Sequence, residues 1–317
     1  LLAVAPSGGA LVGVDVAETY VHAEVFDLGL DVLSRAEAEL RPGDRAPATV
    51  VARVADTVRS AVERAAVPPE RVLGVGVSMP GVVDRAGGVS VYASNWDWHR
   101  VPLRELLAEH LPYRLHLDNP LRACTLAELW FGAARGREDA VVVNLGTGVG
   151  AGLALGGDLY RGTTNSAGEW GHTTLVPDGR RCHCGGRGCV EAYVGAPGIM
   201  RTLRDHAPHS PLLHPDDQTA TIAALAAAHA TGDATATAVV DRTAQLLGTA
   251  VADLVNLLDP EVVVLSSWVS AKLGPALLPA LRAAVAGRAL PRPRAAAEIV
   301  LCPLRANPVS LGAAAFA

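Results

Sequence analysis

The first eighty residues contain apolar segments of two different periods. Short apolar segments at 11–16, 21–26 and roughly 32–40 are separated by brief turns, and this pattern predicts three consecutive strands. Valines recur at helical spacing over 48–67, and a strand pattern returns at 72–78. The chain is therefore expected to open with a β-meander, followed by a helix and a strand.

The second half of the chain repeats this arrangement. Two apolar strands separated by glycines fill 141–155, helices follow, and the apolar run at 262–265 suits a buried parallel strand. Further elements are expected as helices over 102–111, about 120–134, 219–230 and 236–257, and as a strand over 113–117. Because the same order of elements occurs twice, we expect two similar α/β domains that face each other across a cleft.

Composition narrows the class of protein. Of the 317 residues, 50% are hydrophobic and 19% are charged, which excludes a disordered chain. The net charge of −5 argues against a chain-wide electrostatic grip on nucleic acid. No apolar run reaches the roughly 18 residues that a membrane-spanning helix needs, and the first ten residues lack the features of a secretion signal. We therefore expect a soluble, cytoplasmic protein that does not contact a membrane.

Three of the five cysteines lie within eight residues of one another, and this clustering favours metal chemistry over disulfides. Cys182, Cys184 and Cys189 follow His172, and three thiolates with one imidazole form a tetrahedral ligand set for a structural Zn²⁺. The glycines between the cysteines permit a tight loop. His183 is an alternative fourth ligand, although its place between two cysteines would direct its side chain away from the metal. The remaining alternative is a set of ordinary buried cysteines with a hydrogen-bonded histidine.

The same segment carries a family resemblance. The sequences EWGH (169–172) and CHCGGRGCVEAY (182–193) resemble the E-x-G-H and C-x-C-G-x-x-G-C-x-E signatures of the ROK family, whose name stands for repressor, open reading frame and kinase. Other family landmarks are matched in order by SMPGVVD (78–84), NWDWHRVPL (95–103), AELWFGAARG (127–136), NLGTGVGAGL (144–153) and LDPEVVVL (258–265). The resemblance implies a two-domain α/β fold that is actin-like and hexokinase-like (ribonuclease H-like). We expect a smaller domain at 1–118 plus 305–317 and a larger domain with the zinc loop at 119–304.

The resemblance also implies a sugar site. In sugar-binding members, the residues that match Glu169, His172 and Glu191 contact sugar hydroxyls, and those that match Asn95 and Asn119 assist. Carboxylates accept hydrogen bonds from vicinal hydroxyls, and an imidazole that binds a metal through one nitrogen offers the other in a fixed direction. Solvated loop charges are the alternative for the two glutamates.

A kinase of this family needs a base, and here the base position is changed. Family kinases carry an Asn-Asp pair at the start of the helix expected at 120–134, and the aspartate is the base. This chain has Asp118, Asn119 and Pro120 at the corresponding place. Proline cannot accept a proton, whereas it suits the first turn of a helix for which Asn119 serves as N-cap. Loss of a positioned base costs on the order of 10²–10⁴ in rate.

Two of three expected phosphate-binding segments are also changed. The family pattern D-x-G-G-T becomes Asp15-Val16-Ala17-Glu18-Thr19, in which both glycines are lost and a carboxylate would repel phosphate. The segment LDPEVVVL should lead into glycines that make room for a nucleoside, but it leads into Ser266-Ser267-Trp268. Only the glycine-rich turn 146–150 keeps its pattern, so ATP and Mg²⁺ are not expected as cofactors.

Arg122 stands where the family commonly has asparagine. One hypothesis is that its cation favours a phosphorylated or acidic sugar. The alternative is an ordinary surface arginine on a helix.

These observations favour sensing over catalysis. Our leading hypothesis is the sugar-sensing effector body of a ROK-type regulator, a homo-oligomer (dimer or tetramer) that contacts DNA only through a separate N-terminal domain. The start at Leu1 fits a chain trimmed of such a domain. The first alternative is an ATP-dependent, glucokinase-like sugar kinase with Asp118 as a displaced base. The second alternative is a zinc-stabilised scaffold that binds no small ligand.

Overall fold

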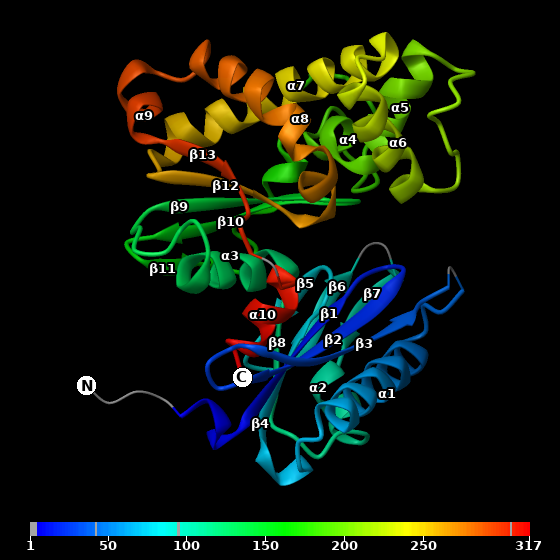
Figure 1. Ribbon diagram of the computed structural model, residues 1–317, viewed down its shortest axis with the longest axis vertical. Coiled ribbons are helices and arrows are strands. Elements are labelled where there is room, and N and C mark those ends of the chain that lie inside the picture. The colour runs from blue at the N-terminus through cyan, green and yellow to red at the C-terminus, as the bar shows by residue number, and fades with distance from the viewer. Residues whose placement is uncertain (1–4, 42, 94–95, 305) are drawn as a thin grey trace. The chain divides into compact units, whose positions relative to one another are not determined.

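The computed structural model of the chain describes residues 5–41, 43–93, 96–304 and 306–317 (Figure 1). Internal contacts divide the chain into two units. Unit 1 comprises Leu1–Ala127, Gly162–Ser166 and Leu304–Ala317, and unit 2 comprises Glu128–Arg161 and Ala167–Pro303. Each unit is built on a five-stranded sheet of mixed direction, as the repeated order of elements in the sequence predicts.

The sheet of unit 1 has the strand order β3-β2-β1-β4-β8. The first three strands form the antiparallel meander, and β4 and β8 add parallel strands on the other side of β1. The bounds of these strands are β1 Ala10–Val16, β2 Tyr20–Asp27, β3 Val32–Glu39, β4 Val72–Ser78 and β8 Leu115–Asp118. They agree with the predicted strands to within one residue, apart from β8, which starts two residues later than predicted.

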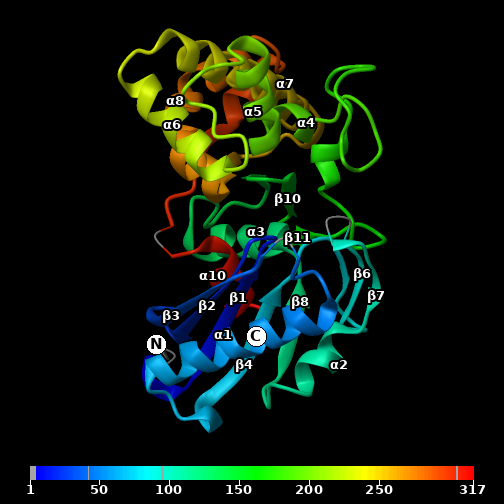
Figure 2. The same cartoon turned by 90° about the vertical axis from the view of Figure 1, so that its right-hand side faces the viewer.

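Helices cover both faces of this sheet (Figures 1 and 2). Val12 and Val14 of β1 pack with the valines of α1 (Pro47–Ala65) in one core cluster, because alternate residues of a strand point to the same face. On the opposite face, α10 (Pro308–Ala314) approaches so closely that a Cβ on Gly76 would lie 1.7 Å from the carbonyl oxygen of Ala313. Glycine in β4 therefore permits the close approach of α10.

A second, smaller sheet in unit 1 was not predicted from the sequence. It contains β5 (Val82–Asp84), β6 (Val89–Ala93) and β7 (Trp98–Val101) in antiparallel order. These strands are short, and two of them contain exposed polar positions, so the alternation of apolar and polar residues is weak. The helices α2 (Leu103–Ala108) and α3 (Pro120–Phe131) flank β8 in the chain, as expected.

The sheet of unit 2 has the order β11-β10-β9-β12-β13, which repeats the plan of unit 1 with an antiparallel half and a parallel half. Its strands are β9 Ala140–Leu145, β10 Val149–Leu155, β11 Asp158–Tyr160, β12 Val262–Ser266 and β13 Glu298–Leu301. The helices of the unit are α4 Glu191–Val194, α5 Ala196–His206, α6 Gln218–Ala230, α7 Ala234–Leu258, α8 Ser267–Ala286 and α9 Pro291–Ala296. The longer helices gather on one face of this sheet and form the main core with it (Figure 1).

Helix α8 is long and apolar enough to cross a membrane by length and composition alone, with a mean hydropathy of 1.2. Inspection of uninterrupted apolar runs does not detect it, because Lys272 and Arg282 divide the sequence. Within unit 2, Leu273, Leu277 and Leu281 of this helix are fully buried in the core. Packing in the core of an α/β unit therefore accounts for the apolar character of α8.

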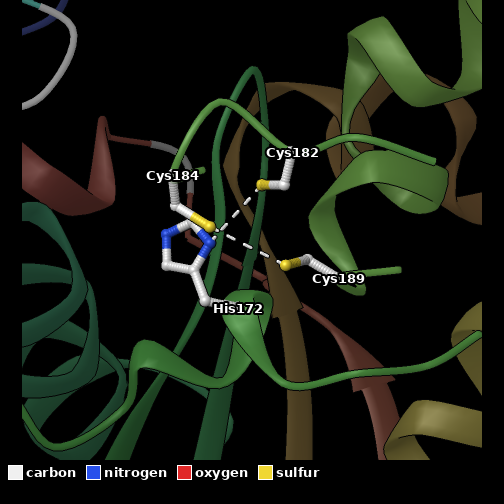
Figure 3. Close-up of side chains that lie close together, drawn as sticks. All are labelled: His172, Cys182, Cys184 and Cys189. Carbon is white, nitrogen blue, oxygen red and sulfur yellow. Dashed lines mark hydrogen bonds between the residues drawn. The ribbon is translucent and has the colours of Figure 1, made fainter. Parts of the chain in front are cut away.

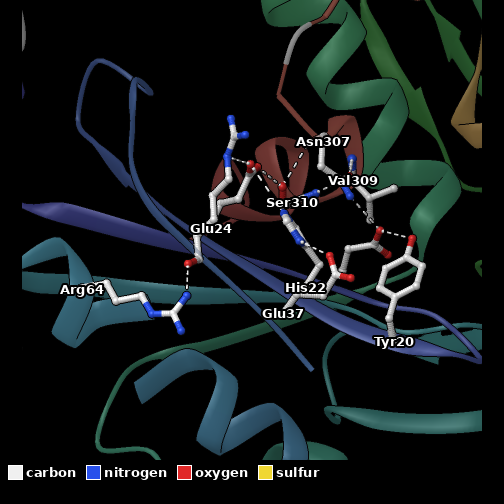
Figure 4. A network of polar contacts seen from close by, with 10 residues as sticks. Tyr20, His22, Glu24, Glu37, Arg64, Asn307, Val309 and Ser310 are labelled. Atoms are coloured by element: carbon white, nitrogen blue, oxygen red, sulfur yellow. Dashed lines mark hydrogen bonds and ion pairs between the residues drawn. The ribbon is translucent and has the colours of Figure 1, made fainter. Parts of the chain in front are cut away.

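A buried polar cluster lies beneath α10 in unit 1 (Figure 4). The carboxylate of Glu24 is 1% exposed, accepts a hydrogen bond from the Ser310 hydroxyl and lies 2.8 Å from Arg35 Nε. His22 bridges two carboxylates, with Nε2 3.5 Å from Glu24 and Nδ1 3.2 Å from Glu37. The hydrogen bond with Glu24 raises the pKa of His22, although burial opposes this effect.

The free energy of unfolding is expected to fall as pH rises above about 6.5. Because the pKa of His22 is raised in the folded state, its stabilisation is complete below the unfolded pKa and is lost as pH rises through the folded value. The slope is at most about 1.4 kcal/mol per pH unit, the value for one proton. Urea unfolding of the wild type and of His22→Gln at several pH values between 6 and 9 measures it. A slope of equal size in His22→Gln would contradict the assignment.

Candidate functional site

The cysteine-rich loop of unit 2 brings the four predicted metal ligands together (Figure 3). The ligand atoms of His172, Cys182, Cys184 and Cys189 all lie within 4.8 Å of one another. Cys182 Sγ is 3.7 Å from His172 Nδ1, and Cys184 Sγ is 3.8 Å from Cys189 Sγ. Sulfurs bound to a tetrahedral Zn²⁺ at about 2.3 Å lie about 3.8 Å apart. The donor set and its spacing are therefore consistent with zinc.

The burial of this group also suits a structural metal. Cys182 and Cys189 are buried, and burial raises the pKa of both thiols. Cys184 is exposed and closes the group from the solvent side. A structural zinc site has four protein ligands and no open coordination position. Three sulfurs and one nitrogen supply four such ligands.

Glycines give the loop its tight turns, as the sequence predicts. Gly185 and Gly188 have φ angles of +91° and +76°, which disfavour a side chain. A Cβ on Gly188 would lie 1.8 Å from the carbonyl oxygen of Val176. The amide N–H of Cys182 donates to the Gly186 carbonyl at 2.9 Å, which turns the intervening residues back on themselves.

Arg180 fastens this loop to the neighbouring helix α5. Its guanidinium donates to the Gly198 carbonyl at 2.9 Å and to the Thr202 hydroxyl at 3.1 Å, and it pairs with Asp205 at 2.9 Å. It also lies 4.9 Å from the ring centroid of Tyr193, close enough for a cation–π contact. The loop is thus held from the core side even before any metal is considered.

The predicted sugar-contacting residues of unit 2 adjoin the metal group. His172 turns Nδ1 toward Cys182, and its Nε2 lies 3.9 Å from Glu169 Oε2. The Glu169 side chain is 44% exposed, whereas that of Glu191 is 8% exposed. The Oε2 atom of Glu191 accepts a hydrogen bond from the Val149 N–H at 2.9 Å, in the glycine-rich turn. Glu169, His172 and Glu191 therefore offer polar atoms around a single loop.

His183 lies outside the group of four. Its Nδ1 is 3.1 Å from Glu191 Oε1, and its ring meets the His172 ring edge to face with centroids 5.7 Å apart. It forms a second set of close polar atoms with His172 and Glu191. The side chain thus points toward the Glu191 carboxylate.

The predicted sugar residues of unit 1 are Asn95 and Asn119. Asn95 lies outside the described residues. Asn119 is 4% exposed, and its side-chain oxygen accepts the N–H of Arg122 at 3.1 Å. Its amide nitrogen lies 3.5 Å from the Gly81 carbonyl oxygen. The predicted role of Asn119 as N-cap of the helix that begins at Pro120 is confirmed.

Asp118 is fully buried and held by cationic neighbours. Its Oδ1 accepts the Asn119 N–H at 2.9 Å, while Arg85 Nε and Arg122 Nε lie 3.8 Å and 4.0 Å from its carboxylate. Arg122 is 3% exposed, so the alternative of an ordinary surface arginine is wrong. Its guanidinium donates to the Asn165 carbonyl at 2.6 Å, which ties the segment Gly162–Ser166 to unit 1.

In the first altered phosphate segment, residues 15–19, the Asp15 carboxylate is hydrogen-bonded by two residues that the sequence analysis did not name (Figure 4). One carboxylate oxygen of Asp15 accepts hydrogen bonds from the Tyr20 hydroxyl and from the Asn307 amide, both at 3.0 Å. Asp15 is 4% exposed, and burial raises its pKa although both hydrogen bonds oppose this effect. Asn307 also caps α10, which begins at Pro308.

The second altered segment packs against the glycine-rich turn in unit 2. A Cβ on Gly146 would lie 3.1 Å from Ser267 Oγ and 3.2 Å from Trp268 Nε1. Ser267 has a φ angle of +78°, a conformation that favours glycine. The serine and tryptophan that replace the expected glycines therefore occupy the space beside Gly146.

Comparisons with known proteins agree with the fold and the landmarks. The family model described as the ROK family matches residues 11–317. A glucokinase of Thermotoga maritima is 34% identical over 273 residues, which is 84% of this chain and 84% of the relative. A xylose repressor of Caldicellulosiruptor bescii is 26% identical over 274 residues, 85% and 68% of the two chains. The solved structure of a ROK family glucokinase from Streptomyces griseus, in complex with glucose and AMPPNP, has a TM-score of 0.80 and 27% identity, and the match covers 98% of this chain and 99% of that one.

The protein is thus a two-domain α/β protein of the hexokinase-like class, as predicted. The chain belongs to the ROK family. Both kinases and repressors are among its relatives, and the glucokinase has the higher identity. The names of the relatives therefore favour the kinase alternative over the regulator hypothesis, and the chemistry of individual positions has to decide between them.

Proposed function

We propose that the chain binds a sugar or sugar derivative without phosphorylating it and serves as the ligand-sensing body of a transcriptional regulator. The observation that carries this proposal is Pro120 at the first position of α3, where a kinase of the family needs its base. Asp118 does not replace that base, because its buried carboxylate is held by Arg85 and Arg122. A carboxylate engaged in this way is poorly placed to accept a proton from a sugar hydroxyl.

Sugar binding is supported by the polar atoms around the loop of unit 2. Glu169 presents a half-exposed carboxylate, and His172 keeps one ring nitrogen for a hydroxyl when the other faces the sulfurs. Glu191 has a carboxylate oxygen held by the Val149 N–H. Asn119 keeps an amide donor, and Asn95 completes the proposed set.

Zinc is the proposed structural cofactor, held by His172, Cys182, Cys184 and Cys189. When bound, it would offset most of the charge of the three deprotonated thiols and fix the loop, and it supplies no reactive chemistry in this proposal. The direction of His172 would then be set, because Nδ1 is the nitrogen beside the sulfurs. The loop between Glu169 and Glu191 would thereby become a fixed wall of the sugar site.

Nucleotide binding is not part of the proposal, because the residues present do not fit MgATP. The Asp15 carboxylate is engaged by Tyr20 and Asn307. Trp268 and Ser267 fill the space beside Gly146. The contacts of Asp15 lie in unit 1, and those of Trp268 lie in unit 2. One expected phosphate-binding segment is therefore altered in each unit.

The proposed regulator would act as a homo-oligomer and contact DNA through a further domain. A sugar changes such a protein only if it binds the alternative arrangements with different affinity. The repressors among the relatives support this role.

An ATP-dependent sugar kinase is the second candidate, and the identity to glucokinases favours it. That identity is measured over 84–92% of the chain and mainly reports the shared fold, whereas Pro120 and Trp268 stand where chemistry is expected. Sugar-dependent release of ADP separates the two candidates.

Titration calorimetry with a panel of hexoses, pentoses, amino sugars and sugar phosphates is expected to give binding by at least one sugar. Glu169→Gln and Glu191→Gln are each expected to weaken it at least tenfold, because a hydrogen bond to a charged group is lost. Asp253→Asn, which removes an exposed carboxylate from α7, is the matched control and should bind like the wild type. Absence of binding by every member of the panel would overturn the proposal.

A further inference from the structure

His183 lies in the cysteine-rich loop but is not one of the four residues of the metal group. Among the ion pairs of the described residues, its partner is Glu191. Its Nδ1 lies 3.1 Å from Glu191 Oε1. A carboxylate only accepts hydrogen bonds, so the nitrogen that faces it carries the hydrogen in either protonation state of the ring. The 46% exposed side chain reaches inward to a carboxylate that is 8% exposed. A half-exposed residue thus donates to a buried acceptor.

The two oxygens of Glu191 have different surroundings. Oε2 accepts the Val149 N–H at 2.9 Å, and this contact involves no metal ligand. Oε1 lies 3.4 Å from Cys182 Sγ, 3.9 Å from His172 Nδ1 and 3.1 Å from His183 Nδ1. Two of these three neighbours belong to the metal group. The hydrogen bonds that Oε1 can accept therefore depend on whether that group holds a metal ion.

Metal binding would change what Cys182 offers to Glu191. A free thiol donates weakly to Oε1, whereas a metal-bound thiolate has no hydrogen to donate. The Nδ1 atom of His172 would likewise be directed at the metal. A thiolate 3.4 Å from a carboxylate places two negative groups side by side, and only part of that charge is offset by the metal. His183 would then be the remaining donor at Oε1 among the described contacts.

We propose that His183 is a positioning residue for Glu191, holding Oε1 in place when zinc occupies the loop. The inference rests on the proposed function, in which Glu191 contacts the sugar. With His183 at Oε1 and Val149 at Oε2, the carboxylate is fixed at both ends, and its remaining lone pairs face in defined directions. Without His183, repulsion from the Cys182 sulfur turns the carboxylate and loosens its hydrogen bond with the Val149 N–H.

The matched pair His183→Asn and His183→Gln tests this assignment. The amide of asparagine places an N–H near the position of Nδ1, whereas that of glutamine places it near Nε2. Both side chains are polar at a half-exposed position, so folding is not at risk. His209→Asn, an exposed histidine of the same unit, is the control.

Three quantities are measured on the zinc-loaded protein. Zinc per chain is expected to stay at the wild-type value in every variant. The sugar affinity found by calorimetry is expected to fall about tenfold in His183→Gln and to stay within about twofold in His183→Asn. Hydrogen exchange of the Val149 amide, measured without sugar, is expected to be about tenfold faster in His183→Gln only, because its acceptor has moved.

Different results overturn different claims. Zinc loss in His183→Gln would make His183 a ligand and overturn the positioning role. Equal affinity and equal Val149 exchange in both variants would overturn it as well. If the wild type binds no sugar, the proposed function fails, while the exchange of Val149 still decides whether His183 holds Glu191.

Discussion

Replacement of Cys189 by serine is expected to remove zinc from the protein and to abolish measurable sugar binding. Cys189 is 3% exposed, and its sulfur faces that of Cys184 across the proposed metal position. A structural zinc site binds with an apparent free energy of about 10–16 kcal/mol in small peptides, and a set of three ligands in place of four weakens it. Because His172 is both a proposed ligand and a proposed sugar contact, loss of the metal is expected to release the sugar site too. A loss of at least 100-fold in affinity corresponds to about 2.7 kcal/mol.

The measurement combines zinc content, thermal melting and sugar calorimetry. Local unfolding of the loop is expected to lower Tm by about 10 °C, since about 3 kcal/mol corresponds to that shift for a unit of this size. A chelator should reproduce the effect in the wild type and have no further effect on Cys189→Ser. Cys302→Ser, which changes a thiol outside the metal group, should keep its zinc. Full zinc content in Cys189→Ser, or none in the wild type, would contradict the assignment.

The metal group could be predicted from the sequence because its determinants are local. Three of its residues lie between positions 182 and 189, and glycine is the residue type that the turns of such a loop require. The meander and the helices α1, α3, α6 and α7 were also predictable, since each shows its own period of apolar residues, whereas α5 and α8 were not predicted. The cap at Asn119 followed from the residue types at the start of α3.

The contacts around Asp15 and Arg122 were not predictable, because they join distant positions. Asn307 donates to Asp15 from 292 residues away, and no local pattern connects them. The buried guanidinium of Arg122 donates to the carbonyl of Asn165. Asn165 lies in the segment Gly162–Ser166, which belongs to unit 1 although the residues before and after it in the sequence belong to unit 2. Helical spacing alone gave no sign of that segment. Residue types therefore predicted which positions differ from the family kinases, and the fold showed what surrounds those positions.

Wild-type protein supplied with MgATP and any sugar that it binds is expected to release ADP at the background rate. Loss of the base alone lowers the rate by on the order of 10²–10⁴ relative to a kinase that has one. The engaged carboxylate of Asp15 and the side chain of Trp268 beside Gly146 would lower nucleotide affinity in addition. The Thermotoga maritima glucokinase, assayed at equal concentration, serves as the positive control.

Variants at the base position separate the lost base from the lost nucleotide site. Pro120→Asp returns a carboxylate to the first turn of α3, where an acidic residue favours the helix dipole, so the variant should fold. Pro120→Asn is the uncharged control. Pro120→Asp is expected to remain at background, because Trp268 still occupies the space beside Gly146. The double variant with Trp268→Gly is expected to be the first to bind ATP detectably. Steady ADP release by the wild type would instead identify a kinase and overturn the proposed function. Because Pro120 cannot accept a proton, another residue would then have to accept the proton of the sugar hydroxyl.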